Sequence, residues 1–322
     1  MNGELRLLAD IGGTNARFAL EAPDGTFADI EVLACADFAT LDEAMRTYLG
    51  QAAQRGLATA SLRHAAIAIA NPVEEDRVSM TNHHWSFSIE ALRQQQGLTT
   101  LLVVNDFAAL AMSLPHLAAD GRERIGGGVE LTERPIGLIG PGTGLGVSGV
   151  IPAGGKRWIA LASEGGHVSF APANKEEVRI LEALWSEFGH VSAERLLSGM
   201  GLELIHRVLA GQRREAAAIT GAALDGSCAD CRRTVDTFCA ILGSVAGNVA
   251  LTLGATGGMY IGGGIVPRLG ALFTGSSFRA RFEDKGRLSP YLARIPTYLI
   301  TEQYPALRGV SAMLPERAAT LP

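Results

Sequence analysis

The chain has 322 residues, of which 47% are apolar and 19% are charged, and its formal net charge is −5. This length is comfortable for two domains, and the composition is that of a folded globular protein. The acidic balance and the lack of a basic stripe argue against a nucleic-acid partner. No long apolar run opens the sequence, so we expect no signal peptide.

The first part of the chain alternates apolar runs with amphipathic segments. Residues 5–9 and 16–20 are short apolar runs on either side of a Gly pair, which predicts a hairpin. Ser88 and Gly97 are start and stop signals for a helix. The elements expected after the hairpin are helices at 41–54, 88–97 and 107–114 and buried strands at 64–73, stopping at Pro72, and at 101–106.

The same order begins again near residue 135, where two apolar runs flank a Gly-rich turn over 135–151. Helices are expected at 175–188, 192–210, 215–225, 231–254 and 305–317, with strands at 258–265 and 297–301. Alternating strands and helices predict an α/β fold, and one architecture used twice predicts two halves with a ligand between them.

Residues 237–266 carry no charge and are long enough to span a bilayer. They contain eight glycines, which would break a single helix. We interpret the stretch as a buried helix followed by a buried strand, and we expect no membrane partner.

Three Gly-rich turns, at 10–15, 140–146 and 262–264, follow apolar strands. Glycine lets backbone N–H groups approach phosphate oxygens, although each turn alone is also typical of a plain hairpin or strand-to-helix connection. Residues 144–149 match GxGxxG, but strand rather than helix follows them, so we reject the dinucleotide interpretation. The P-loop lysine is also absent.

Acidic and polar side chains provide candidates for chemistry. Asp106, at the end of a buried strand, is either a base for a sugar hydroxyl or the N-cap of the next helix. Glu164, His167 and Glu194 suit the paired hydrogen bonds that a polyol needs. The simpler alternatives are a satisfied loop histidine and, for Glu194, the first turn of a helix. Asn82 belongs to a further polar patch.

Cys228-Ala-Asp-Cys231 has the spacing of a zinc or redox pair. No second Cys or His pair accompanies it, so we expect free thiols in a reducing cytoplasm and no structural zinc.

Taken together and in this order, the motifs resemble those of the bacterial glucokinase family, within the superfamily of actin and hexokinase. The matching segments include DIGGTNARFAL, VVNDFAALAMSLP, GPGTGLGVS, SEGGHVSFAP, FGHVSAERLLSG and GGMYIGGGIVPR. They run from about residue 8 to about residue 312. The related repressor/kinase group has a Cys-rich zinc motif after its sugar-binding Glu and His, and this sequence has no cysteine there.

The resemblance implies a two-domain, actin-like (duplicated ribonuclease H-like) α/β sugar kinase fold with an interdomain cleft. The small domain would comprise 1–114 with 302–322, and the large domain 115–301. The implied reaction is phosphorylation of D-glucose by ATP with Mg²⁺, the first step of glycolysis, in a cytoplasmic homodimer.

The resemblance also implies roles for individual residues. Asp106 would be the catalytic base, and Asp10 would face Mg²⁺ through water. The residues expected to bind glucose are Asn82, Asn105, Asp106, Glu164, His167 and Glu194. The residues expected to bind the nucleotide are Asp10, Ile11, Gly12, Gly13, Thr14, Asn15, Gly140, Gly142, Thr143, Gly144, Gly262, Gly263 and Gly264.

Two alternatives stay open. One is a kinase for another hexose or an amino sugar. The other is a non-catalytic, sugar-sensing actin-like ATPase, which lacks support because no DNA-binding or partner segment is evident in the sequence.

Overall fold

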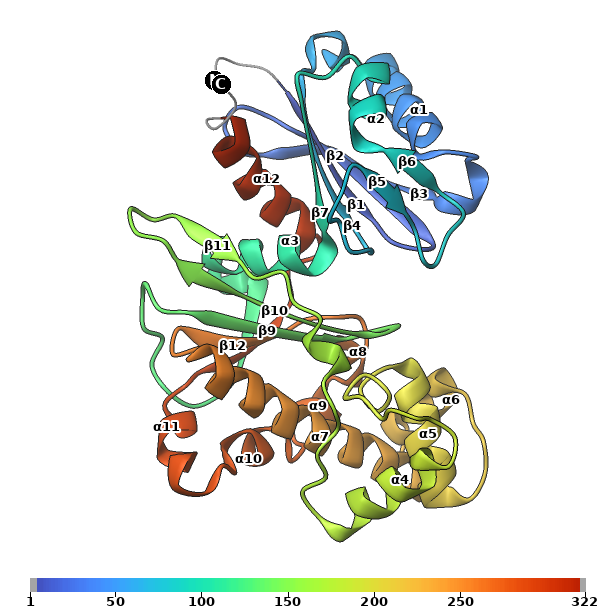
Figure 1. The fold of residues 1–322 in the computed structure, drawn as a ribbon, viewed down its shortest axis with the longest axis vertical. Coiled ribbons are helices and arrows are strands. Elements are labelled where there is room, and N and C mark those ends of the chain that lie inside the picture. The colour runs from blue at the N-terminus through green and yellow to red at the C-terminus, as the bar shows by residue number, and fades with distance from the viewer. Residues whose placement is uncertain (1–4, 319–322) are drawn as a thin grey trace. The chain divides into compact units, whose positions relative to one another are not determined.

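The computed structural model describes residues 5–318, which form two compact units (Figure 1). The N-terminal unit combines Met1–Leu117 with Gln303–Pro322, and the C-terminal unit is Ala118–Glu302. The domain limits expected from the sequence, 114/115 and 301/302, stay a prediction.

Each unit is built on a mixed β-sheet. In the described part of the N-terminal unit the strand order is β3-β2-β1-β4-β7, and in the C-terminal unit it is β11-β10-β9-β12-β13-β8. The strands of the first unit are β1 (Arg6–Ile11), β2 (Asn15–Glu21), β3 (Phe27–Ala34), β4 (His64–Ile69) and β7 (Thr100–Asn105), with a separate hairpin of β5 (Arg77–Ser79) and β6 (Ser86–Ser88). The strands of the second are β8 (Arg122–Gly126), β9 (Ile136–Pro141), β10 (Leu145–Pro152), β11 (Trp158–Ala160), β12 (Gly258–Ile261) and β13 (Thr297–Ile300).

Helices cover the sheets. Those of the N-terminal unit are α1 (Leu41–Gln54), α2 (Ile89–Gln95), α3 (Asp106–Ser113) and α12 (Pro305–Ala318). Those of the C-terminal unit are α4 (Lys175–Trp185), α5 (Gly199–Ala210), α6 (Ala216–Leu224), α7 (Ala229–Leu253), α8 (Val266–Leu269), α9 (Ala271–Thr274), α10 (Phe278–Glu283) and α11 (Ser289–Ala293).

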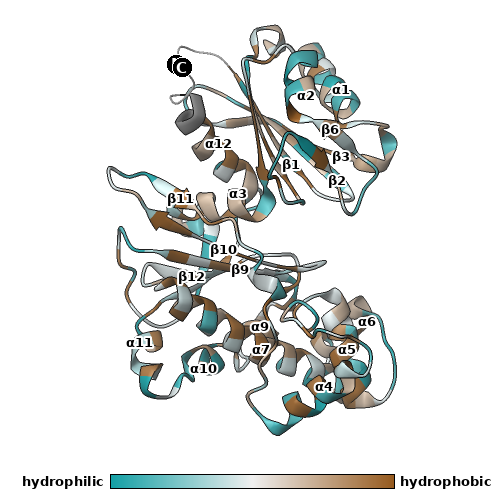
Figure 2. Ribbon diagram, in the orientation of Figure 1, coloured by the Kyte–Doolittle hydropathy of each residue, from teal (hydrophilic) through white to brown (hydrophobic). Residues whose placement is uncertain are grey.

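The N-terminal sheet is buried on both faces. Leu7 and Ala9 of β1 pack in a core with α1, whereas Leu8 between them packs in a second core with α3 and α12. Figure 1 shows α1 and α2 on one side of this sheet and α3 and α12 on the other, and Figure 2 shows its strands largely in hydrophobic colours. Burial on both faces explains why the strands have near-continuous apolar sequences.

Local signals in the sequence set several helix ends. The Thr40 side chain accepts a hydrogen bond from the Glu43 N–H at 3.2 Å and begins α1, and the Ser88 side chain accepts one from Ala91 N–H at 3.0 Å and begins α2. Gly97 follows α2 with φ of 63°, the left-handed conformation that ends helices. These boundaries confirm the helices predicted from residues 41 and 88.

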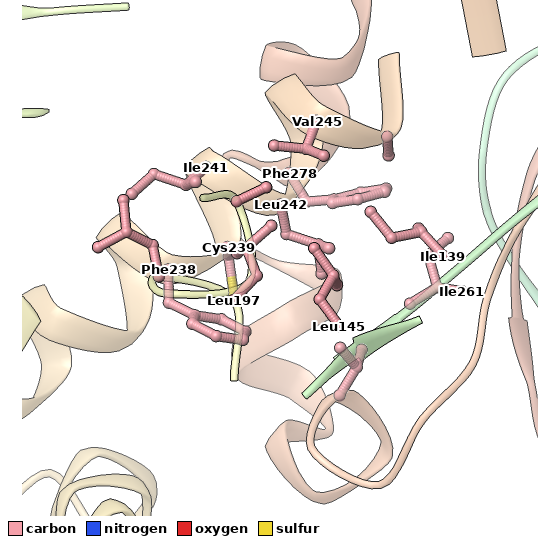
Figure 3. Packing of buried hydrophobic residues seen from close by; sticks show 14 of the residues in the cluster. Ile139, Leu145, Leu197, Phe238, Cys239, Ile241, Leu242, Val245, Ile261 and Phe278 are labelled. Carbon is pink, nitrogen blue, oxygen red and sulfur yellow. The ribbon is translucent and has the colours of Figure 1, made fainter. Parts of the chain in front are cut away.

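The C-terminal core is centred on α7. Figure 3 shows Leu242 and Val245 of this helix on the side of the cluster toward Ile139 of β9 and Ile261 of β12, and Phe238 at the opposite end of the cluster. Helix α7 is long and apolar enough to cross a membrane, but 67% of its most apolar window is buried inside the protein, as in a core helix. The interpretation of residues 237–266 as a buried helix followed by a buried strand is therefore confirmed.

Several predicted elements extend beyond their observed limits. The strand expected over 258–265 ends at Ile261, and the helix expected over 175–188 ends at Trp185. The helix expected over 192–210 begins only at Gly199, where Ser198 caps it. The backbone N–H of Ala193 donates to Val168 O at 2.8 Å and that of Glu194 to Gly166 O at 2.9 Å, so tertiary hydrogen bonds hold this segment out of the helix. The strand expected over 64–73 ends at Ile69.

Candidate active site

The first Gly-rich turn joins β1 and β2, so the predicted hairpin is confirmed. The N–H of Gly12 donates to Asn15 O at 3.0 Å and closes the turn. Ile11, at the end of β1, pairs with Ile69 of the parallel strand β4, and Ile69 pairs with Asn105 of β7. The parallel strands β1, β4 and β7 therefore end at the same level of the sheet. The turn between β1 and β2, Asn105 and Asp106 all lie at this edge.

Asp10 stands near the end of β1, opposite Arg17 of β2. Its Oδ2 lies 3.2 Å from Arg17 Nη1, and 23% of the side chain is exposed. Burial raises the pKa of the Asp10 carboxyl, and the Arg17 charge partly opposes the rise. Arg17 was not among the residues predicted for the site, although its place across the hairpin could have indicated the pairing.

Asp10 has the chemistry of a magnesium ligand that acts through water. Among residues 5–318 no cluster of three or more His, Cys, Asp or Glu side chains could enclose a metal. Mg²⁺ bound with nucleotide keeps several waters and needs only one or two carboxylates in addition to phosphate oxygens. A single, partly exposed carboxylate beside a Gly-rich turn fits this mode.

Asn105, not Asp106, is the N-cap of α3. The Asn105 Oδ1 accepts hydrogen bonds from Phe107 N–H at 2.9 Å and Ala108 N–H at 3.2 Å. Asp106 is the first residue of the helix, where the helix dipole favours a negative charge. Its Oδ1 accepts from Phe107 N–H at 2.9 Å and from Asn105 Nδ2 at 3.2 Å. The N-cap that was the alternative role of Asp106 therefore belongs to Asn105, and the role of Asp106 as a base stays a prediction.

Asn71 links the ends of β4 and β7 and was not predicted. Its backbone O lies 3.4 Å from Asn105 Nδ2, and its Oδ1 accepts from the Thr81 hydroxyl at 2.8 Å. The signal that could have found it is its position directly after a buried strand and before a proline. Next to Thr81, Asn82 lies against the first turn, because a Cβ added at Gly13 would be 3.1 Å from Asn82 Cβ.

The second and third Gly-rich turns lie together in the C-terminal unit. Gly142 N–H donates to Gly144 O at 2.8 Å within the β9–β10 hairpin. Gly263 follows β12 with φ of 78°, and a Cβ there would overlap the Pro141 carbonyl. Only glycine fits this position, because it combines a left-handed backbone with close approach to another chain segment.

Glu164, His167 and Glu194 are brought together beside the second turn. His167 Nε2 lies 3.9 Å from Glu164 Oε2, and His167 Nδ1 lies 3.9 Å from Glu194 Oε1. These distances are too long for hydrogen bonds, and the His167 and Glu164 side chains are 61% and 67% exposed. Glu194 Oε2 accepts from Leu145 N–H at 2.9 Å, so the alternative that Glu194 only stabilises a helix start is wrong.

The fold matches that of solved sugar kinases. A glucokinase structure from an Antarctic psychrotroph is 35% identical, has a TM-score of 0.86 and covers 97% of this chain and 99% of its own. A ROK family glucokinase from Streptomyces griseus, 18% identical with a TM-score of 0.64, covers 97% and 100% and shows the same fold. The protein is thus a two-domain α/β sugar kinase.

Sequence comparison identifies the family. The glucokinase family model matches residues 7–317. The glucokinase of Chromobacterium violaceum is 56% identical over 321 residues, which cover 98% of this chain and 90% of that protein. The bifunctional protein glk of Paraburkholderia xenovorans is 54% identical over 97% of this chain, which spans only 49% of that protein's length. The chain belongs to the glucokinase family and is a hexose kinase that phosphorylates glucose with ATP.

Proposed function

We propose that Asp106 is the catalytic base of this kinase. The observation that supports the role most is its position at the start of α3, on the sheet edge that also holds the turn after Asp10. A carboxylate there can accept the proton of the glucose 6-hydroxyl as that oxygen attacks the γ-phosphorus of ATP. The new bond joins O6 to phosphorus, the bond from phosphorus to the β,γ-bridging oxygen breaks, and ADP leaves.

The Gly-rich turns supply backbone N–H groups for the phosphates. We assign this role to Gly13 in the N-terminal unit and to Gly144 in the C-terminal unit. Gly12 and Gly142, whose N–H groups donate to Asn15 O and Gly144 O, close the two turns, and Gly263 supports the latter turn. The Streptomyces griseus enzyme is described in complex with glucose and AMPPNP, which supports ATP as the donor. Asp10 would hold Mg²⁺ through water, and the ion would supply positive charge to the phosphates.

Glu164, His167 and Glu194, together with Asn82 and Asn105, would recognise the sugar. An imidazole that lies 3.9 Å from each of two carboxylates can, together with them, pair several vicinal hydroxyls, each of which is costly to bury unpaired. The exposed side chains of Glu164 and His167 are free of mutual hydrogen bonds and can accept this ligand. A glucokinase from Balamuthia mandrillaris is described in complex with glucose.

ADP release with ATP, Mg²⁺ and a panel of hexoses tests the assignment. We expect glucose to give the highest kcat/KM, with mannose, fructose and glucosamine lower. A better substrate among these sugars would favour the alternative hexose or amino-sugar kinase. ATP turnover without any sugar would favour an actin-like ATPase and contradict the proposal.

We further propose the domain limits 1–114 with 302–322 and 115–301, a place at the first step of glycolysis in the cytoplasm, and a homodimer. The family membership supports these assignments. Analytical ultracentrifugation of the purified protein checks the dimer, for which a monomer mass would be the contrary result.

A further inference from the structure

Two cysteines at the start of α7 have no part in the proposed kinase site. Cys228 is the N-cap of this helix, and its Sγ accepts a hydrogen bond from Cys231 N–H at 3.3 Å. Cys228 is partly exposed and Cys231 is buried. The pair therefore consists of one thiol that solvent reaches and a second, protected thiol on the residue whose backbone N–H contacts the first.

The surroundings of the pair favour the thiolate of Cys228 over that of Cys231. Arg214, in the loop between α5 and α6, lies with its Nη1 3.0 Å from Cys231 Sγ. The pKa of Cys228 is lowered, first by the hydrogen bond from the Cys231 thiol and then by the Cys231 backbone N–H, whereas burial raises the pKa of Cys231. Asp230 adds an opposing charge in the first turn of the helix. Cys228 thus has the character of an attacking thiol and Cys231 that of a resolving thiol.

Neither a zinc site nor a simple helix cap accounts for the whole arrangement. A zinc site would need about four ligands, and the described residues 5–318 contain no group of three or more His, Cys, Asp or Glu side chains that could hold a metal ion. Helix capping alone would be served by Ser or Thr at position 228 and would need neither a second thiol nor Arg214. Both thiols are free, so the pair stands in its reduced form.

We propose that Cys228 and Cys231 form a reversible intrachain disulfide, and that this is a redox-modification site for low-molecular-weight disulfides such as oxidised glutathione. The Cys228 thiolate attacks one sulfur of the disulfide and releases the first thiol, leaving a mixed disulfide on Cys228. The Cys231 thiolate then attacks the Cys228 sulfur and releases the second thiol. Two electrons pass from the pair to the small disulfide, and the two protons of the pair leave with the released thiols.

The experiment uses the full chain, reduced, desalted and equilibrated in glutathione buffers of increasing oxidised fraction. Free thiols are then trapped with N-ethylmaleimide in denaturant, and intact mass and peptide mapping locate the bridge. After trapping, we expect a species that carries two N-ethylmaleimide groups where the reduced protein carries four and whose polypeptide is two hydrogens lighter. Its bridge should join residues 228 and 231, and excess reductant should return it fully to dithiol. In the native reduced protein at pH 7, Cys228 should alkylate roughly three- to tenfold faster than free cysteine.

Variants separate the pair from the other cysteines. Cys228→Ser, which keeps a capping side chain, should abolish the bridge, and Cys231→Ser should leave a mixed disulfide at Cys228. Cys239→Ser removes a buried thiol of the same helix and should leave bridge formation unchanged. Arg214→Gln should slow the resolving step and prolong the mixed disulfide.

Three results would overturn the proposal. One is a thiol count that stays constant across the whole glutathione range. Another is a terminal mixed disulfide at Cys228 in the wild-type protein that Cys231 never resolves. The third is one equivalent of zinc in the purified protein that blocks alkylation of both thiols. None of these readouts depends on kinase activity, so the proposal and the kinase assignment fail independently.

Discussion

The Glu194 carboxylate and the Leu145 backbone are joined by a hydrogen bond of 2.9 Å from Leu145 N–H to Glu194 Oε2. Leu145 directly follows the Gly142–Gly144 turn, and a Cβ at Gly144 would overlap the same carboxylate oxygen. The other oxygen, Oε1, lies 3.9 Å from His167. One side chain therefore contacts both the turn assigned to phosphate and the group assigned to sugar, and we expect it to couple the binding of the two substrates.

Replacement of Glu194 by Gln or Ala should separate these two contacts. Gln retains an oxygen that can accept from Leu145 N–H but loses the charge, so KM for glucose should rise about tenfold or more while KM for ATP changes little. Ala removes both contacts, so both KM values should rise. Steady-state kinetics with each substrate varied checks this. If each variant changed KM for glucose and KM for ATP by the same factor, the Glu194 side chain would not have two separate roles.

Asp106→Asn should remove the catalytic base and leave the local structure unchanged. We expect kcat to fall by roughly two to four orders of magnitude, with KM for glucose within about threefold of wild type. Glucose binding by calorimetry and turnover by coupled ADP detection measure the two quantities separately. A near-normal kcat would exclude Asp106 as the base.

Asn105→Ala is the companion variant, because Asn105 caps α3. Loss of the cap should cost about 1 kcal/mol of stability and lower Tm by about 2–4 °C. Asp106→Asn should not lower Tm in this way, because the cap remains. A Tm loss in Asp106→Asn equal to that of Asn105→Ala would mean that Asp106 serves the helix rather than the reaction.

Much of the architecture was predictable because its signals are local. The 41–54 helix has the same limits in the structure as in the prediction, since Thr40 and the periodicity of α1 act within a few residues. Both Gly-rich hairpins were predicted for the same reason, and so was the buried nature of α7.

The parts that were missed depend on long-range contacts. The 192–198 segment has helical composition, but hydrogen bonds from Ala193 to Val168 and from Glu194 to Gly166 hold it in turns. The edge strand β3 and the short strands β8 and β11 have no hydrophobic run of their own and exist because a neighbouring strand pairs with them. Asn71 acquires its role only from Asn105 and Thr81, which follow it by at least ten residues in the chain.

The raised pKa of Asp10 should give stability an unusual pH dependence. Because the folded protein holds this proton more tightly than the unfolded chain does, the contribution of Asp10 to stability is full below the ordinary Asp pKa of about 3.9. It is lost as pH rises through the raised folded-state pKa. Asp10→Asn is always neutral, so its Tm relative to wild type should climb over this interval and then level off, while its kcat falls. Thermal melts in steps from about pH 4 to pH 8 measure the difference.

Asp24→Asn is the matched control for this experiment. Hydrogen bonds from the Thr26 side chain and backbone lower the pKa of the Asp24 carboxyl, so its small contribution is present above the ordinary Asp pKa and disappears as pH falls. The Tm of Asp24→Asn relative to wild type should therefore fall slightly as pH rises. A pH-independent Tm difference for Asp10→Asn would show that its folded-state pKa is ordinary.

Gly263 and Gly264 are neighbours at which we expect alanine substitution to have different effects. Alanine at Gly263 would have to adopt φ of 78° and would overlap the Pro141 carbonyl, whereas alanine at Gly264 would meet nothing within 4 Å. Gly263→Ala should therefore lose roughly 1–3 kcal/mol of stability and displace the turn after Pro141. Because that turn is assigned to phosphate, KM for ATP should rise about tenfold while KM for glucose changes less.

Comparing the two variants separates the effect of the left-handed backbone and close contact at Gly263 from the general effect of replacing a glycine by alanine. Gly264→Ala should have wild-type Tm, since its backbone conformation is accessible to alanine and no protein atom lies in the space around it. Thermal melts and ATP titrations on both variants are sufficient to measure these effects. If Gly263→Ala unfolds earlier but binds ATP normally, the third turn supports the fold without contributing to the nucleotide site. If both variants weaken ATP binding equally, the close contact with Pro141 is not what positions the second turn.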